Sequence, residues 1–286
     1  YPPLPLGLLS RRWHTALLPR GERPMELKDK VIVITGGASG IGAALARRFA
    51  QEGPKALAIV DRNAEGAAAV AAEVGGVAYG VDLRDEHAVE TLIDTIERDQ
   101  GPIDLFCSNA GIGLGRGIDT TTEDWRTILD INLMAHVFAA RALVPRMVAR
   151  GGGYLLNTAS AAGLLSQIGS VTYAVTKHAA VSLAEWLSIT HGDEGLKVSV
   201  LCPQAVDTPM IAGTEQGGVA GVDGIMAPET VADVVVEGLR AERFLILPHP
   251  EVETYLQRKT ADYDRWLGGM RRLQARYGEN AVKGLS

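Results

Sequence analysis

The chain has 286 residues, of which 47% are hydrophobic and 22% are charged, with a formal net charge of −6. This composition argues against intrinsic disorder, and the length allows one large α/β domain or two small ones. The negative charge argues against a nucleic-acid or anionic-membrane binder, and no uninterrupted apolar run reaches the roughly 18 residues of a membrane span. Two cysteines and six scattered histidines predict no disulfide framework and no metal site, and they favour a cytoplasmic location.

Residues 1–24 differ in composition from the rest. They hold five of the 13 prolines, four arginines and one acidic residue, Glu22. An arginine-containing, acid-poor segment is typical of a targeting peptide. An upstream-extended start is the alternative that we favour. We expect a mobile leader over 1–24, a functional start at Met25 and a single domain over 25–286.

From residue 30 onward, short β-branched runs alternate with helical periodicity. We predict strands over 31–34, 56–60, 77–81, 103–107, 153–157, 198–201 and 244–247. We predict helices over 41–50, 63–74, 85–99, 123–150, 171–191 and 229–239. Strands that alternate with helices predict right-handed βαβ units and a doubly wound parallel sheet covered on both faces.

The turn between the first strand and the first helix is rich in glycine. It reads Thr35-Gly36-Gly37-Ala38-Ser39-Gly40-Ile41-Gly42. Glycines allow a tight turn and a close approach to a pyrophosphate, while the helix N-terminus presents free N–H groups. The spacing is G-x-x-x-G-x-G, and the absence of a following Gly-Lys-Ser/Thr excludes a P-loop. Taken alone the turn is equally compatible with a plain loop, but its place after a strand favours a dinucleotide site.

Asp61 follows the second predicted strand. An acidic side chain there accepts hydrogen bonds from an adenosine ribose, and its charge would repel a 2′-phosphate. Asp61 therefore predicts NAD rather than NADP. Arg62 points the other way, because a guanidinium could hold that phosphate. The structural alternative is that Asp61 merely caps the helix that starts near Asn63.

Tyr173 and Lys177 lie four residues apart in a predicted helix, so they share one face. An ordinary phenol has a pKa of about 10, and a nearby ammonium favours the phenolate, by roughly one to three units. Tyr173 would then be a workable general base toward an alcohol, or a general acid toward a ketone. Each residue alone also has a structural reading, as a core-edge aromatic and as a solvated lysine.

The ordered set of motifs resembles the short-chain dehydrogenase/reductase family, single-domain branch, over roughly residues 28–247. Besides the glycine-rich turn, the motifs are Asp82-Leu83, Asn109-Ala110-Gly111, Asn132, Ser160, Tyr173-x-x-x-Lys177, and Pro203 with Val206-Asp207-Thr208-Pro209. A lone Tyr-x-x-x-Lys is common by chance, whereas the whole set in this order is specific. The resemblance implies a Rossmann fold with a seven-stranded parallel sheet in the order 3-2-1-4-5-6-7.

The resemblance also implies roles for individual residues. The catalytic set would be Asn132, Ser160, Tyr173 and Lys177, with Ser160 on the reacting oxygen, Lys177 also on the nicotinamide ribose and Asn132 holding a water in a proton relay. Asp82 would contact adenine, Asn109 would support the sheet and the cofactor, and Thr208 would bind the carboxamide. The implied cofactor-binding residues are Gly36, Ser39, Gly40, Ile41, Gly42, Asp61, Asp82, Leu83, Asn109, Ala110, Gly111, Tyr173, Lys177, Pro203, Val206 and Thr208. The expected assembly is a homotetramer or dimer.

The substrate side is less determined. The family commonly has Pro-Gly after the sixth strand, whereas this chain has Pro203-Gln204, so Gln204 is either a substrate contact or a tolerated exposed residue. Stretches 161–170 and 210–227 flank the expected pocket, and the second, glycine-rich one predicts a mobile lid. Both are largely apolar and contain no Arg or Lys, so we expect a neutral or hydrophobic secondary alcohol or ketone.

The amphipathic helical extension over about 250–286 would pack on its own domain or on a neighbouring subunit. For the whole protein, the first hypothesis is an NAD-dependent alcohol dehydrogenase/reductase. The alternatives are an NADP-dependent carbonyl reductase and a non-catalytic nucleotide-binding protein on the same fold.

Overall fold

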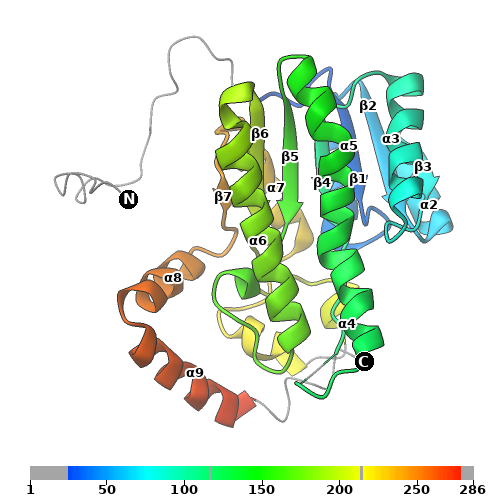
Figure 1. The fold of residues 1–286 in the computed structure, drawn as a ribbon. Helices are drawn as coiled ribbons and strands as arrows, with labels where there is room; N and C mark the ends of the chain where they lie inside the picture. Colours follow the sequence, from blue (N-terminus) through cyan, green and yellow to red (C-terminus); the bar gives the residue numbers. More distant parts are fainter. Residues whose placement is uncertain (1–24, 116, 213–214, 278–286) are drawn as a thin grey trace.

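A parallel sheet forms the centre of the protein (Figure 1). The computed structural model describes residues 25–115, 117–212 and 215–277, and the expected leader over 1–24 lies outside these ranges. Within the described residues the strands are β1 (Val31–Thr35), β2 (Ala56–Asp61), β3 (Val77–Gly80), β4 (Leu105–Ser108), β5 (Gly153–Thr158), β6 (Leu196–Leu201) and β7 (Leu245–Ile246). Their order is β3-β2-β1-β4-β5-β6-β7, which confirms the expected topology.

Helices cover both faces of this sheet. One face carries α1 (Gly40–Ala50), α2 (Ala64–Val74) and α7 (Pro228–Arg240). The other face carries α3 (Glu86–Gln100), α5 (Ala135–Ala149) and α6 (Val171–His191), which lie in front of the strands in Figure 1. Strand order reverses between β1 and β4, and the carboxyl ends of the strands open a crevice at such a switch point.

β1 shows why apolar and polar residues do not alternate along these strands. Ile32 and Ile34 pack into the layer that contains α1, whereas Val31 and Val33 pack into the layer that contains α3 and α5. All four side chains are buried. A strand covered on both faces must be apolar at every position, and this is why a short β-branched run was a sufficient signal for it.

The long predicted helix over 123–150 is interrupted. It consists of α4 (Thr122–Leu129), a π-helical turn η1 (Asp130–Met134) and α5. By length and composition alone, Thr122–Ala149 would be long and apolar enough to cross a membrane. Ala139, Leu143 and Met147 of this helix are buried in one of the two core layers, which is how the core helix of a globular protein behaves.

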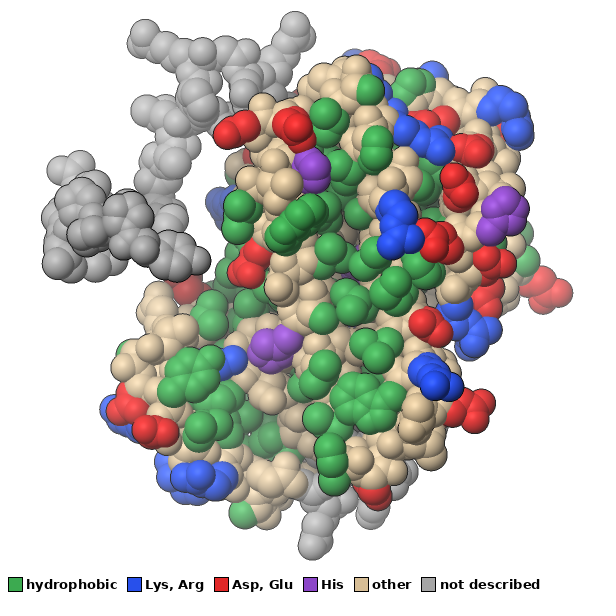
Figure 2. Space-filling model, viewed as in Figure 1, with side chains coloured by type: hydrophobic (Ala, Val, Ile, Leu, Met, Phe, Trp, Pro, Cys, Tyr) green, Lys and Arg blue, Asp and Glu red, His purple; other side chains and the backbone are tan. Residues whose placement is uncertain are grey.

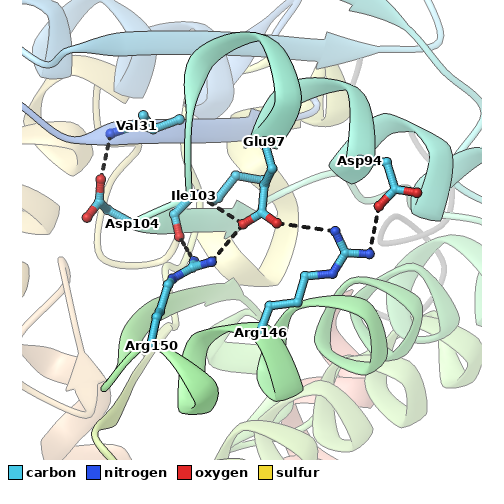
Figure 3. A network of polar contacts seen from close by, with 7 residues as sticks. All are labelled: Val31, Asp94, Glu97, Ile103, Asp104, Arg146 and Arg150. Atoms are coloured by element: carbon cyan, nitrogen blue, oxygen red, sulfur yellow. Dashed lines mark hydrogen bonds and ion pairs between the residues drawn. The ribbon is translucent and has the colours of Figure 1, made fainter.

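A network of charged groups joins α3 to α5 where the chain enters β4 (Figure 3). The Glu97 carboxylate accepts hydrogen bonds from Arg150 Nη1 at 2.8 Å, from Arg146 Nη1 at 3.2 Å and from the Ile103 backbone N–H at 3.1 Å. The Asp104 carboxylate accepts a hydrogen bond from the Val31 backbone N–H at 2.9 Å. These contacts lie at the amino ends of β1 and β4, at the edge opposite the crevice.

Short helical turns and two further helices complete the chain. They are η2 (Ala161–Gly163), η3 (Gly192–Glu194), η4 (Pro209–Ile211), η5 (Glu215–Gly221), α8 (Glu251–Ala261) and α9 (Tyr263–Tyr277). The predicted lid over 210–227 thus begins within η4 and contains η5, while residues 213–214 of it lie outside the described ranges. The expected C-terminal helical region forms α8 and α9, which reach beyond the sheet in Figure 1, and residues 278–286 are not described.

Candidate active site

A cleft of about 2020 Å³ runs along the carboxyl ends of the strands. Of the residues that the sequence nominated for catalysis or cofactor binding, all line this cleft except Gly42 and Asn132. The structure therefore brings together motifs that are spread from residue 36 to residue 208. Gly42 and Asn132 do not line the cleft. They contact residues that do, namely Gly36 and Ile112.

The glycine-rich turn is built by close backbone approach. Gly36 has a φ of +66°, and a Cβ there would lie 2.9 Å from the Ala110 Cα. A Cβ on Gly42 would lie 2.1 Å from the Gly36 carbonyl oxygen. Neither position can accept a side chain, since real Cβ contacts are longer than this. Gly42 therefore permits the helix to pack under the turn, and it does not itself face the cleft.

Asp61 holds the glycine-rich turn at the end of β2. Its carboxylate accepts hydrogen bonds from the Ala38 backbone N–H at 3.1 Å and from the Asn63 backbone N–H at 2.9 Å. The cap of α2 is Asn63, whose side chain accepts a hydrogen bond from the Gly66 N–H. The alternative that Asp61 is the helix cap is therefore wrong, and Asp61 lines the cleft.

Asp82 and Arg84 form an ion pair near Asp61 in the cleft. Arg84 Nη2 lies 2.6 Å from Asp82 Oδ2, and this hydrogen bond is the main reason that the pKa of Asp82 is lowered. Arg62 lines the same part of the cleft. This end of the cleft thus carries both acidic and basic groups.

Asn109 joins the ends of three strands. Its Nδ2 donates to the Thr35 carbonyl at 3.1 Å, and its Oδ1 accepts from Thr158 Oγ1 at 3.1 Å. Thr35 Oγ1 in turn accepts from the Asn109 and Ala110 backbone N–H groups. Thr35 belongs to the glycine-rich motif, but the sequence did not identify it as the residue that joins β1 to the end of β4. A local sequence pattern does not show which strands pair.

Asn132 lies in the π-helical turn η1 and is fully buried. Its Oδ1 accepts from the Ile112 N–H at 2.8 Å, while its Nδ2 donates to the Ile112 carbonyl at 2.9 Å and to Thr176 Oγ1 at 3.2 Å. Single π-turns inside helices often occur at functional sites. The side-chain amide is fully used, and the water-holding role of Asn132 stays a prediction.

Ser160, Tyr173 and Lys177 all line the cleft, and the Ser160 hydroxyl lies close enough to Tyr173 to affect its pKa. Ser160 Oγ accepts from the Ala162 N–H at 3.1 Å. Lys177 Nζ donates to the Thr158 carbonyl at 3.0 Å and lies 5.7 Å from the centre of the Tyr173 ring. α6 presents Tyr173 and Lys177 on one face, as the four-residue spacing predicted.

Burial controls the charges of this group. It lowers the pKa of Lys177 to about 8. It raises the pKa of Tyr173, and interaction with the Ser160 hydroxyl opposes this shift. The pKa of Tyr173 is therefore raised in this structure, because desolvation of the buried phenol is the largest effect on it. The role of the Lys177 ammonium in favouring the phenolate stays a prediction.

Gly111 leaves room for Lys177. A Cβ on Gly111 would lie 3.2 Å from Lys177 Nζ and 3.3 Å from Asn132 Oδ1. The absence of a side chain at this position lets the lysine reach the strand end beside Asn132. The two residues thereby share one polar layer beneath the cleft.

Gln204 belongs to a polar group on the substrate side that the sequence did not reveal. Its Nε2 donates to Asp223 Oδ2 at 3.2 Å, and Tyr255 Oη donates to Asp223 Oδ1 at 2.9 Å. The Gln204 backbone N–H donates to His249 Nδ1 at 3.2 Å. Gln204 and Tyr255 both line the cleft. Amphipathicity predicted the helix that carries Tyr255, but it gave no sign of this contact.

Comparisons with known proteins agree with this geometry. The sequence matches the short chain dehydrogenase family over residues 30–217. It is 38% identical over 243 residues to 1-deoxy-11-beta-hydroxypentalenate dehydrogenase of Streptomyces exfoliatus, which covers 82% of this chain and 88% of the relative. It is 33% identical over 196 residues to meso-2,3-butanediol dehydrogenase of Serratia marcescens, covering 67% of this chain and 77% of the relative.

A solved structure shares both the fold and detectable sequence identity. The crystal structure of a short chain dehydrogenase/reductase from Burkholderia phymatum in complex with NAD resembles this chain with a TM-score of 0.76 and 28% identity. The match covers 84% of this chain and 96% of that one. Together with the ordered motifs at the strand ends, these matches show that the chain belongs to the short-chain dehydrogenase/reductase family of oxidoreductases.

Proposed function

We propose that this protein transfers a hydride between NAD(H) and a hydrophobic secondary alcohol or ketone, with Tyr173 as the acid/base group. The observation that carries the proposal is the convergence of Ser160, Tyr173 and Lys177 in one cleft with the glycine-rich turn. The names of the relatives support oxidoreduction at an alcohol carbon.

The residues at the turn fit a dinucleotide. Gly36 and Gly40 line the cleft and carry no side chain, so the backbone itself forms this wall at the start of α1, and Gly42 packs beneath the turn. A helix N-terminus with free N–H groups favours a phosphate. The glycine-rich turn, Asp61, Asn109 and Thr208 would hold the cofactor along the cleft.

The chemistry divides between cofactor and protein. A bound nicotinamide would supply the hydride acceptor or donor at its C4 atom. In alcohol oxidation, Tyr173 would take the hydroxyl proton as the carbon–hydrogen bond breaks, and Ser160 would orient the reacting oxygen. Lys177 would stabilise negative charge on the phenolate that accepts this proton, because an ammonium close to a phenol favours its ionised form.

Asp61 supports NAD as the preferred cofactor. Its carboxylate lies in the cleft beside the turn, where it would repel a 2′-phosphate. The NAD complex of the Burkholderia phymatum enzyme agrees with this choice. Arg62, which lines the same region, is the feature that would favour NADP-dependent carbonyl reduction instead.

The wall of the cleft supports a bulky, largely apolar substrate. Leu165, Ile168, Met210 and Ile211 come from the two stretches that flank the expected pocket. The hydroxypentalenate dehydrogenases and the butanediol dehydrogenase are named for hydroxyl-bearing small molecules. The expectation of a neutral substrate rested on these two stretches alone, and α8 and α9 add a third wall.

We propose that the protein acts as a homo-oligomer in the cytoplasm. Figure 2 shows hydrophobic side chains gathered on the face where α5 and α6 lie. On α6, Val175 is 45% exposed, Trp186 57% and Ile189 84%. An exposed apolar surface of this kind favours burial against a second subunit.

A panel of secondary alcohols with NAD, followed by the absorbance of the reduced cofactor, tests the proposal. We expect turnover of hydrophobic members and a higher kcat/KM with NAD than with NADP. Better catalysis with NADP would support the carbonyl reductase alternative. Tight binding of NAD without turnover of any alcohol or ketone would favour the non-catalytic alternative.

A further inference from the structure

The outer wall of the cleft carries a group of arginines that the cofactor site does not use. They are Arg258 on α8 and Arg265, Arg272 and Arg276 on α9. We propose that this wall, here called the arginine wall, binds an anionic group of the substrate. The substrate would then be a hydrophobic secondary alcohol or ketone that also carries a carboxylate. The inference rests on the proposed function and specifies its substrate class.

The helical spacing places the arginines of α9 together. Arg265, Arg272 and Arg276 are separated by seven and four residues, so they fall within about 40° of one another around the helix axis. Trp266, Leu273 and Tyr277 line the same cleft from the adjacent part of α9. An apolar strip therefore runs beside a cationic strip, which suits a molecule with an apolar body and an anionic head.

The four guanidinium groups are available to a ligand. Within the described part of the chain, none of them forms an ion pair with an Asp or Glu side chain. The guanidinium of Arg258 lies 6.0 Å from the centre of the Tyr255 ring, and that of Arg276 lies 5.1 Å from the centre of the Tyr277 ring. Arginine binds a carboxylate through two parallel N–H bonds, so such a ligand matches both its charge and its shape.

The helices that carry the arginine wall are fixed to the substrate side of the domain. Lys259 on α8 is buried, and its Nζ donates to the Leu164 carbonyl at 2.6 Å and to the Leu165 carbonyl at 3.3 Å. The same Nζ lies 5.0 Å from the centre of the Trp266 ring on α9. Lys259 therefore joins both helices to the loop that follows β5. This loop borders Ser160 and lines the cleft.

A second contact fixes α8 from the other side. Tyr255 donates to Asp223, which also accepts from Gln204. Gln204 follows Pro203 at the end of β6, beside the catalytic group. The contacts that hold the arginine wall in place are therefore made to residues that border the expected substrate position. The pyrophosphate of a dinucleotide would lie instead at the glycine-rich turn, so the cofactor does not account for these arginines.

A matched pair of substrates tests the inference. The probes are a medium-chain hydroxy acid with its hydroxyl on the penultimate carbon and its methyl ester, which differ in charge at one end only. We expect the acid to have a kcat/KM at least about tenfold above that of the ester, a difference of about 1.4 kcal/mol. This preference should shrink at high ionic strength, because salt screens exposed charges.

The test variant is the double substitution Arg272→Gln and Arg276→Gln, with Arg271→Gln as the control. Arg271 lies on the same helix but does not line the cleft. The double variant should lose most of the preference for the acid, with unchanged kcat/KM for the ester and unchanged KM for NAD. Arg271→Gln should change none of these values. Equal use of acid and ester by the unmodified protein, or an acid preference that survives the double substitution, would overturn the inference.

Calorimetric binding of the two probes separates this inference from the proposed function. Tighter binding of the acid that depends on Arg272 and Arg276, without hydride transfer to NAD, would support the arginine wall and contradict the proposed activity. Turnover of the ester and the acid with equal affinity would leave the activity standing and remove the arginine wall. Binding of the two probes with equal affinity and no turnover would contradict both.

Discussion

Lys177 and Tyr173 lie on one face of α6, with the lysine Nζ 5.7 Å from the centre of the phenol ring. The lysine is anchored from below, since its Nζ donates to the Thr158 carbonyl at the end of β5. The ammonium is therefore held by the sheet under the ring, where it can act on a phenolate that forms during the reaction. Several consequences can be measured.

Tyr173→Phe removes the proton-transfer group and little else. General acid–base catalysis contributes about 10²- to 10⁴-fold in rate, so kcat should fall by that amount. The affinity for NAD, measured by calorimetry, should stay within about twofold, because Asp61 and the glycine-rich turn are unchanged. Full turnover by this variant would remove the acid/base assignment.

Lys177→Met should abolish activity and yet stabilise the fold at neutral pH. Burial lowers the pKa of Lys177 from 10.5 to about 8, so the charged form costs the folded state about 3 kcal/mol, at about 1.4 kcal/mol per unit. Loss of the hydrogen bond to Thr158 offsets part of the gain and leaves roughly 1–2 kcal/mol. Urea unfolding at pH 7 measures this difference.

The pH dependence of the same comparison gives a control. The folded-state pKa of Lys177 is lower than the unfolded one, so the unfolded chain binds more protons between pH 8 and 10.5. The stability of the unmodified protein relative to Lys177→Met should therefore rise across this range. A variant that is less stable than the unmodified protein at pH 7 would show that the buried ammonium is not destabilising.

Asp61→Asn should shift cofactor preference toward NADP. The amide keeps an oxygen that can accept one of the backbone hydrogen bonds from Ala38 and Asn63, but it removes the charge that repels a 2′-phosphate. The ratio of kcat/KM for NADP over NAD should rise by about tenfold or more, a change of about 1.4 kcal/mol in relative transition-state binding. Arg62→Gln is the matched control and should move the ratio the other way. An unchanged ratio in Asp61→Asn would show that the carboxylate does not select the cofactor.

Gly42→Ala should weaken NAD binding through the backbone. The new Cβ would lie 2.1 Å from the Gly36 carbonyl oxygen, so the turn must open, at a cost of about 1–3 kcal/mol. Gly192→Ala is the control, because Gly192 has a φ of −59° and no atom lies within 4 Å of its added Cβ. Calorimetry and thermal unfolding should show losses for Gly42→Ala only. Equal NAD affinity in the two variants would refute a close-packed turn.

His136 should make the fold sensitive to acid. It is buried on α5, and burial followed by the Lys177 charge lowers its pKa from 6.5 to about 3. The folded state therefore resists protonation, so this contribution to stability is complete above pH 6.5 and falls as the pH drops toward 3. Between pH 6.5 and 5 the loss should be about 2 kcal/mol, at about 1.4 kcal/mol per pH unit.

His136→Gln should remove this part of the acid sensitivity. Urea unfolding at pH 6.5 and pH 5 should show a smaller drop for the variant than for the unmodified protein, whatever its absolute stability. His249, whose pKa is also lowered by burial, contributes to the acid sensitivity of both proteins alike. Identical drops would mean that His136 becomes protonated without opposing the fold.

Much of the fold could be predicted from the sequence because its signals are local. The run from Val31 to Ile34 is apolar at every position, which is what a strand covered on both faces requires. The spacing of Gly36, Gly40 and Gly42 within seven residues marks the turn, and the Cβ that Gly42 lacks would meet the Gly36 carbonyl oxygen of the same turn. Tyr173 and Lys177 lie on one face of α6 because residues four apart in an α-helix are separated by little more than one turn.

The rest depended on contacts between distant parts of the chain. The pKa of Lys177 follows from burial between α6 and the strand ends, and no residue near it in sequence predicts that burial. Asn132, in the π-helical turn of the long helix, is hydrogen-bonded to Ile112, a residue 20 positions earlier that no local pattern identifies as its partner. We expected a neutral substrate from the two flanking stretches alone, and that expectation did not take the arginines of α8 and α9 into account. Those helices line the cleft, and Lys259 on α8 bonds to the Leu164 carbonyl, 95 residues earlier in the chain.

The sequence alone therefore determined the layered sheet and the family, because apolar runs and an ordered series of short motifs carry those signals along the chain. It also nominated Asn132, Ser160, Tyr173 and Lys177, whose catalytic roles are predictions. The tertiary structure alone decided the charges inside the site and the character of its outer wall. Those properties depend on which side chains lose water and which come into contact, and burial and contact exist only once the elements have packed.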